Sequence, residues 1–132
     1  MYYIVVATHG KLGYELVNSM EMIIGKQKKI IVLGLKHDDD PKILKESFKE
    51  CVSNYGKKNL IFLVDLLGGA VSNTAKFLAK EGVPVLTGVN LPMLLEVVAY
   101  RYTSNVIDSD YILSICKNSM WDLRNLVNRD NF

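Results

Sequence analysis

This sequence of 132 residues contains no long apolar run. Its longest uninterrupted apolar stretches are far shorter than the ~18 residues that suggest a membrane span. A secretory signal peptide is not expected either, because the first predicted strand already begins at residue 2. These absences predict a soluble, cytoplasmic protein.

Cysteine is scarce as well: the chain has only Cys51 and Cys116, which lie far apart. Each falls among apolar residues that repeat with helical spacing. We therefore interpret both as reduced thiols of the core, which excludes a disulfide and a metal-binding cysteine pair.

An excess of one charge is also missing. The 16 lysines and arginines are balanced by 14 aspartates and glutamates, which gives a formal net charge of +2. The densest basic group, at residues 26–29, leads into a predicted strand and suits a solvated turn. This distribution gives no reason to expect nucleic-acid binding.

The sequence instead alternates between buried strands and amphipathic helices. Strands are predicted at residues 2–7, 30–35, 60–64 and 83–87. Helices are predicted at residues 12–24, 41–55, from the glycine turn at 66–73 to about residue 80, 92–102 and 111–116. The last segment, Ser119–Val127, fits either a helix or a short strand.

Four alternations of strand and helix predict one α/β domain over residues 1–132, with an open parallel sheet and helices on both faces. Right-handed crossovers place the first strand inside the sheet, so the simplest strand order is 2-1-3-4. In such a sheet a crevice opens between the carboxyl ends of strands 1 and 3.

His9 ends the first strand and Asp65 ends the third, so both are expected at the mouth of that crevice. A carboxylate that holds one imidazole nitrogen leaves the other nitrogen as an aimed nucleophile. Gly68 and Gly69 allow a close approach of the backbone, and the helix start after them offers N–H groups for an anion. Asn90 begins a further helix that faces the same space.

These parts suit the transfer of a phosphoryl group, which needs an in-line nucleophile and donors for the equatorial oxygens. The Walker lysine motif is missing, and Ser72 lies in no nucleophile-elbow pattern. A receiver-like domain phosphorylated on Asp65 is also excluded, since Thr8 and His9 stand where such a domain needs acidic residues for Mg²⁺. No metal ion or nucleotide cofactor is expected.

The second histidine, His37, opens an acidic turn that ends in Asp40 and Pro41. This turn is better explained by a helix start than by a metal site, because Asp40 suits the N-cap and Pro41 the first helical position. We expect His37 on the surface, on the far side of the first strand.

Four segments of this chain resemble a known family, in the family's order and spacing: ATHG at 7–10, EMIIG at 21–25, VDLLGG at 64–69 followed by Asn73, and TGVNLPMLLE at 87–96. With these motifs the chain resembles an enzyme IIA domain of the mannose family of the bacterial phosphoenolpyruvate-dependent sugar phosphotransferase system. The C-terminal third of the chain matches only loosely.

The resemblance implies a phosphocarrier. His9 would accept a phosphoryl group from the carrier protein HPr and pass it to a IIB component, for uptake of a mannose-class sugar, with Asp65 orienting the ring. Membrane contact would then be indirect, through the transporter complex. The resemblance also implies a homodimer in which a C-terminal strand crosses to the partner subunit.

The glycine turn departs from the family, which usually continues it with Ser-Pro where this chain has Ala70 and Val71. Ser72 or backbone N–H groups must then contact the phosphate. We therefore expect a phosphate-binding set made of Gly68, Gly69, Ser72 and Asn90. Apolar residues near the crevice are expected to dock the partners and exclude water, namely Leu66, Leu67, Leu91 and Met93.

Two alternatives remain open at this stage. The chain could serve a dihydroxyacetone kinase system as its phosphocarrier domain, although the intact segment 87–96 favours the sugar branch. It could also be a regulatory module whose phosphorylation state is only a signal, which the change at Ala70 and Val71 allows. Trp121 is expected to pack at a dimer interface.

Overall fold

The computed structural model describes residues 1–127. Within this part of the chain the strands form one sheet, in which every pair is parallel and the order is β2-β1-β3-β4. The predicted fold class and strand order are therefore confirmed. The strands are β1 (Tyr3–His9), β2 (Ile30–Leu35), β3 (Leu60–Val64) and β4 (Val85–Thr87).

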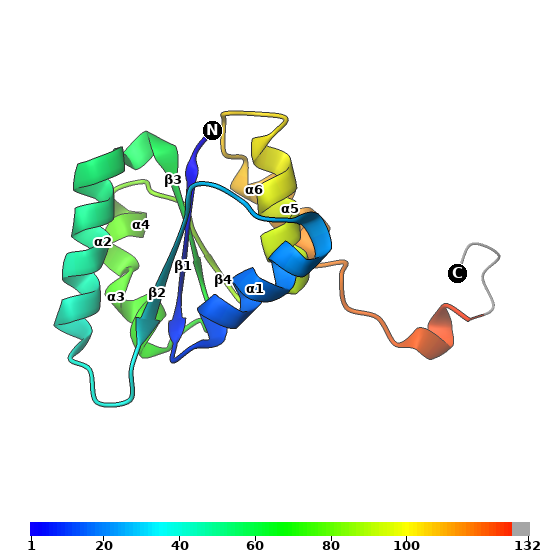
Figure 1. The fold of residues 1–132 in the computed structure, drawn as a ribbon, viewed down its shortest axis with the longest axis horizontal. Coiled ribbons are helices and arrows are strands. Elements are labelled where there is room, and N and C mark those ends of the chain that lie inside the picture. Colours follow the sequence, from blue (N-terminus) through cyan, green and yellow to red (C-terminus); the bar gives the residue numbers. More distant parts are fainter. Residues whose placement is uncertain (128–132) are drawn as a thin grey trace.

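Helices cover both faces of this sheet, as Figure 1 shows. One layer contains α1 (Leu12–Ile24), α5 (Leu91–Arg101) and α6 (Ser109–Cys116). The other contains α2 (Pro41–Tyr55), α3 (Ala70–Thr74) and α4 (Lys76–Lys80). Two single 3₁₀ turns complete the described chain, η1 (Lys57–Asn59) and η2 (Leu123–Asn125).

Side chains of β1 alternate between the two helical layers. Ile4 and Val6 pack in the core beneath α1, α5 and α6, whereas Val5 and Ala7 pack beneath α2, α3 and α4. All four are fully buried, which explains why this strand is apolar without a polar alternation. Burying a Val or Ile stabilises the fold by about 1.5–3 kcal/mol, so the strand that carries His9 is firmly held.

The two cysteines lie in different layers, Cys51 with α2 and Cys116 with α6, on opposite faces of the sheet. Both are free and buried, as predicted. Burial raises the pKa of each thiol. The thiols therefore stay protonated and inert at neutral pH.

The predicted helix starts at the two proline positions are confirmed. Asp40 caps α2 by accepting a hydrogen bond from the Lys42 backbone N–H, with Pro41 in the first position. Asn90 caps α5 in the same way, through a 2.9 Å bond from the Met93 backbone N–H. Each cap satisfies a backbone donor that the helix itself leaves free.

The structure corrects two predicted boundaries. The single helix expected after the glycine turn is split at Ala75, whose N–H is shared between the carbonyls of Val71 and Ser72. The bend keeps Val71 and Leu78 fully buried on either side of it. Strand β4 begins at Val85 instead of residue 83, because Pro84 has no N–H to donate to a ladder.

Residues 119–127 form neither of the two predicted structures. They run as an extended segment into the single turn η2 and lead away from the helical layers, as the orange and red ribbon in Figure 1 shows. No strand pairs this segment with the sheet of its own chain, so a crossing strand stays a prediction for the dimer.

None of the helices described here is both long and apolar enough to cross a bilayer.

Candidate functional site

The site begins with the pairing of β1 and β3. Ala7 lies opposite Val64 in the parallel ladder, so the residues that follow each strand emerge side by side at the carboxyl edge of the sheet. His9 and Asp65 are the polar side chains at this edge. The topology therefore brings together the two residues that the sequence placed at the crevice.

Asp65 holds His9 through one oxygen. Its Oδ2 accepts a 2.8 Å hydrogen bond from the His9 backbone N–H and lies 2.8 Å from the ring nitrogen Nδ1. The His9 side chain is 50% exposed, whereas that of Asp65 is only 11% exposed. Because a carboxylate only accepts, Nδ1 carries the proton and Nε2 is left as the basic, accessible nitrogen.

The charge state of Asp65 is set by two opposing effects. Burial raises the pKa of this carboxyl group, but the hydrogen bonds from the His9 backbone and ring, with the charge of the ring, outweigh it. The pKa of Asp65 is therefore lowered from its ordinary value of 3.8. The residue is a carboxylate at neutral pH, ready to stabilise positive charge on the imidazole.

The second oxygen of Asp65 increases this dependence on His9. Oδ1 is buried and has no hydrogen-bond partner within residues 1–127. An unpartnered buried oxygen is costly, so the two bonds from His9 to Oδ2 are important for holding the group in its charged form. The position of the carboxylate and that of the ring are thus closely coupled.

The glycine turn touches the ring directly. A Cβ atom at Gly69 would meet His9 Cε1 at 3.3 Å and also the Leu66 side chain, so glycine allows the turn to pack against the imidazole. Gly68 has a φ of +84°, a left-handed conformation that only glycine adopts without strain. Glycine is therefore needed at the two positions for different reasons. Gly69 leaves room for the His9 ring, and Gly68 adopts the backbone conformation of the turn.

The turn after His9 is fixed by β2. The Gly10 N–H donates a 2.8 Å hydrogen bond to the Leu35 carbonyl. A Cβ atom at Gly34 would lie 2.5 Å from the Gly10 carbonyl oxygen, a distance that real atoms do not reach. Buried Thr8 also accepts a bond from the Gly13 N–H, which ties the end of β1 to the start of α1.

The remaining residues of the predicted phosphate-binding set are engaged locally. Ser72 is buried, and its hydroxyl donates a 3.1 Å hydrogen bond to the Gly69 carbonyl. Its side chain lines a hollow with Leu67 and Thr87 and not the cleft of His9. The Asn90 side-chain oxygen is used to cap α5, which leaves its amide N–H₂ group.

The predicted docking residues divide into two groups. Leu66 and Leu67 are 60% and 78% exposed, so both present apolar surface beside the site. Met93 is only 4% exposed and belongs to the core under α5, against which Leu91 also packs. The side chain of Met93 is therefore unavailable to a partner, because the face of α5 on which it lies is turned inward.

A cleft of about 570 Å³ adjoins His9 on the side of β2. The residues that line it were not predicted from the sequence. His37 is exposed, as predicted, yet it lines this cleft with Lys36 and Asp39. The Asp39 carboxylate accepts a 2.9 Å bond from the Lys36 backbone N–H, which closes the turn that contains His37. The strand register could have indicated that His37 lies near His9, because His9 lies opposite Leu35, two residues before His37.

Neither this cleft nor any other part of residues 1–127 gathers three side chains that could ligate a metal ion. Ala70 also lines the cleft, and Val71 behind it is fully buried. The two residues that replace Ser-Pro therefore bring no hydroxyl group to His9. The site is an imidazole, its carboxylate and a turn of backbone.

Fold and site together define an α/β domain with a 2-1-3-4 parallel sheet and an exposed imidazole held by a carboxylate at the carboxyl edge of that sheet. Residues 3–111 match the model of the family described as PTS system fructose IIA component, and the chain belongs to this family of sugar phosphotransferase system components.

Curated relatives agree with this assignment. The chain is 32% identical over 101 residues to the PTS system mannose-specific EIIAB component of Escherichia coli (strain K12), which covers 74% of this chain and 31% of the relative. It is 30% identical over 101 residues to the PTS system fructose-specific EIIA component of Bacillus subtilis (strain 168), covering 74% and 69%. The chain thus spans about a third of the length of the mannose-specific relatives it matches.

Solved structures share the fold over nearly the whole chain. The phosphotransferase system component EIIA from Streptococcus agalactiae superposes with a TM-score of 0.86 at 25% identity, covering 95% of this chain and 99% of that one. The mannose/sorbose-specific IIA subunit from Enterococcus faecalis gives a TM-score of 0.82 at 20% identity, covering 92% and 93%.

Proposed function

We propose that this chain is a cytoplasmic phosphocarrier that accepts a phosphoryl group from phospho-HPr on His9 and passes it to a IIB component. The observation that supports this most is the 2.8 Å contact between Nδ1 and Asp65, which leaves Nε2 as the nucleophile on a side chain that is 50% exposed beside a cleft. The transported sugar belongs to the mannose class in this proposal, in keeping with the relatives' names.

In the forward step the lone pair of His9 Nε2 attacks the phosphorus atom in line with the N–P bond of phospho-HPr. That bond breaks, and its electron pair returns to the HPr imidazole. Nδ1 keeps its proton, so the phosphorylated ring of His9 is positively charged and is stabilised by Asp65. The step exchanges one phosphohistidine for another and is therefore nearly balanced and reversible.

The proposed phosphate-binding residues are Gly68, Gly69, Ser72 and Asn90, with Ser72 acting through its backbone N–H because its hydroxyl is bonded to the Gly69 carbonyl. The Gly69 N–H now donates to the Leu66 carbonyl at 3.3 Å, a weak bond that a phosphoryl oxygen can replace. Leu66 and Leu67 would exclude water once a partner covers them, which protects the phosphohistidine from hydrolysis. No metal ion or nucleotide takes part.

The proposal is tested by incubating the protein with phosphoenolpyruvate, enzyme I and HPr, and measuring phosphorylation. We expect an acid-labile, base-stable label on the wild type that is lost in His9→Gln. His37→Gln is the matched control, because it removes the other histidine of the same cleft and should keep the label. A label that survives His9→Gln contradicts the proposal.

Adding a IIB component to the labelled protein distinguishes the phosphocarrier from a second candidate function, that of a regulatory module. The phosphocarrier loses its label to IIB, whereas a regulatory module keeps it. The observation that favours the regulatory function is the absence of a hydroxyl group at Ala70, which lines the cleft of His9. A dihydroxyacetone kinase system as the acceptor would show discharge to that system's components instead.

We also propose that the protein forms a homodimer through its C-terminal segment. Met120, Trp121 and Leu123 are 82%, 53% and 62% exposed on an extended stretch of chain. Such apolar side chains are commonly covered by a partner in solution. A strand formed by this segment on a second subunit would bury them.

A further inference from the structure

The turn that follows β2 brings a lysine to the cleft of His9. Lys36 lines this cleft together with His9 and Ala70. His9 lies opposite Leu35 in the parallel ladder, so Lys36 comes directly after the strand position that faces His9. Neighbouring strands lie about 4.8 Å apart, and lysine carries its charge on a long, flexible stem. Its amino group can therefore reach a group bound to Nε2.

The backbone of Lys36 is firmly held beside the turn of His9. Its N–H donates a 2.9 Å hydrogen bond to the Asp39 carboxylate, and its carbonyl accepts a 3.1 Å bond from the Asp39 N–H. The carbonyl of Leu35, just before it, accepts a 2.8 Å bond from the Gly10 N–H. The point from which the Lys36 side chain extends is thus fixed relative to His9.

The amino group of Lys36, by contrast, is not engaged. The side chain is exposed, and it forms no ion pair or hydrogen bond within residues 1–127. Asp39 lines the same cleft, but its Oδ2 already accepts from the backbone of Lys36. Lys36 also lines a second hollow of about 520 Å³, with Gly10 and Tyr14. The side chain therefore has room to turn toward His9.

The opposite side of the cleft offers no positive charge to a phosphoryl group. Ala70 brings no hydroxyl group, and the hydroxyl of Ser72 is bonded to the Gly69 carbonyl. The charge of Asp65 stabilises the imidazole ring and not the phosphoryl oxygens. A phosphoryl group adds up to about two negative charges, spread over its oxygens. An ammonium group can offset them through charge-assisted hydrogen bonds.

We propose that Lys36 binds the phosphoryl group on His9 from the side of β2 and takes the place of the missing hydroxyl group. The inference rests on the proposed function. As the N–P bond of the donor breaks and the Nε2–P bond forms, Lys36 keeps its protons and donates hydrogen bonds to the phosphoryl oxygens. These bonds exist only while the group is present, so they shift the exchange with HPr toward phosphorylated His9.

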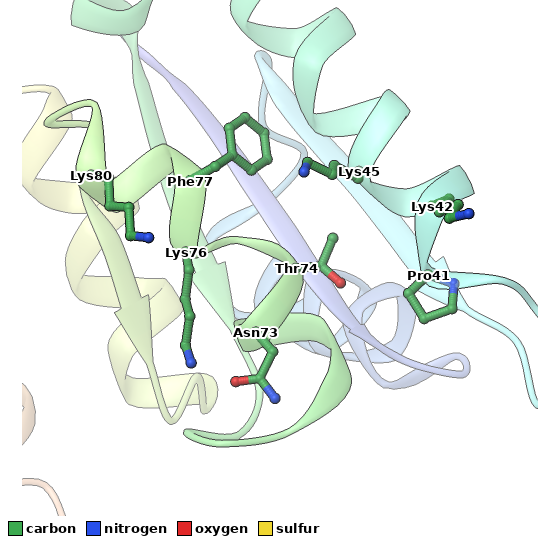
Figure 2. Close-up of a pocket in the computed structure, with 8 residues that line it drawn as sticks. All are labelled: Pro41, Lys42, Lys45, Asn73, Thr74, Lys76, Phe77 and Lys80. Carbon is green, nitrogen blue, oxygen red and sulfur yellow. The ribbon is translucent and has the colours of Figure 1, made fainter.

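The test compares Lys36→Met with Lys42→Met. Lys42 follows Pro41, which lines the cleft of His9, but Lys42 itself lines a separate groove between α2 and α4, shown in Figure 2. Each variant is mixed with phospho-HPr, free of enzyme I, until exchange is complete. We expect the ratio of labelled protein to labelled HPr to fall roughly tenfold in Lys36→Met and to stay near wild type in Lys42→Met. Lys36→Arg should restore the ratio.

A measurement on wild type makes the test independent of any variant. In nitrogen NMR of the lysine amino groups, phosphorylation should shift the signal of Lys36 and leave that of Lys42 unchanged. A Lys36 signal that does not respond overturns the proposal, and so does an equal fall of the exchange ratio in both methionine variants. Circular dichroism and a thermal melt should show that the variants fold.

Two further results separate the possible failures. A fall of the ratio in His37→Gln, with Lys36→Met unchanged, would assign the contact to the histidine of the cleft and overturn the role of Lys36. Wild type that takes no label on His9 refutes the proposed function itself. Wild type that is labelled, with an unchanged ratio in Lys36→Met, overturns only this inference.

Discussion

Asp65 Oδ2 accepts two hydrogen bonds from His9, one from its backbone N–H and one from its ring Nδ1, each 2.8 Å long. The backbone bond fixes the carboxylate to the end of β1, and the ring bond fixes the imidazole to the carboxylate. One oxygen atom therefore sets both the direction and the protonation of the ring.

Replacing Asp65 with asparagine should slow phosphorylation without unfolding the protein. The amide can still accept from His9, but it carries no negative charge for the phosphorylated ring. A hydrogen bond to a charged group contributes about 1.5–3 kcal/mol, so transfer should slow by roughly ten- to a hundredfold. Rapid-quench measurement of label from phospho-HPr checks this. Unchanged transfer kinetics in a folded variant would remove the orienting role of Asp65.

Stability should depend on pH through the same carboxylate. Burial raises the pKa of Asp65, yet the hydrogen bonds of His9 lower it below the ordinary value of 3.8. Its contribution to stability is fully present above that value and is lost as pH falls through the lower pKa of the folded state. Urea unfolding between pH 5 and pH 2 should therefore show a steeper loss for wild type than for Asp65→Asn. Parallel curves would contradict the expectation.

The two glycines of the turn should respond differently to alanine. Gly68→Ala places a side chain in open space at a φ of +84°, so it should lower the free energy of unfolding by about 1–2 kcal/mol. Gly69→Ala has no backbone strain but presses on His9 Cε1, so it should mainly slow phosphorylation. Chemical denaturation and labelling of both variants check this pair. Equal effects on stability and rate in the two variants would count against it.

Arg101 should matter for stability and not for phosphoryl transfer. Its buried guanidinium donates to the carbonyls of Tyr2, Lys28 and Lys29, at the edge of the sheet opposite His9. Arg101→Ala removes these three hydrogen bonds, although the Lys29 carbonyl keeps the one from the Ile4 N–H, and should cost about 2–4 kcal/mol. We expect a lower urea midpoint with a normal labelling rate at low temperature. A variant that is as stable as wild type but is labelled slowly would contradict this prediction.

Trp121 offers a direct test of the dimer. It is the only tryptophan, its side chain is 53% exposed, and its ring N–H donates to the Asn118 carbonyl. If a partner subunit covers it, its fluorescence should shift to shorter wavelength as protein concentration rises. Sedimentation over the same range should show the dimer. A monomer mass together with unshifted emission at every concentration would exclude it.

The sequence predicted best those features that are decided locally. Apolar runs marked every strand, although the run predicted for β4 began two residues too early, and Asp40 with Pro41 and Asn90 with Pro92 marked two helix starts. The meeting of His9 with Asp65 followed from the order of strands, because parallel strands end at a common edge. These features depend on neighbours in the chain or on topology alone.

Other features depend on how finished elements pack, and no local pattern carries that information. The sequence around Ala75 is continuously helical in character, yet the helix is split there, with Val71 and Leu78 buried on either side. Met93 stands in a helix with apolar residues on several faces, so its inward rotation was not visible. His37 lines the cleft from a turn that the Asp39 carboxylate closes on the Lys36 N–H, a contact that spacing does not reveal.

Gly34 shows how far the demands of the site extend. It lies on β2, contributes no functional group, and leaves no room for even a methyl group beside the Gly10 carbonyl. Any larger residue must push the turn that follows His9, so the geometry of the site also constrains a neighbouring strand. If His9 carries the phosphoryl group as proposed, a genetic screen for lost sugar uptake should recover changes at Gly34, although it has no functional group of its own.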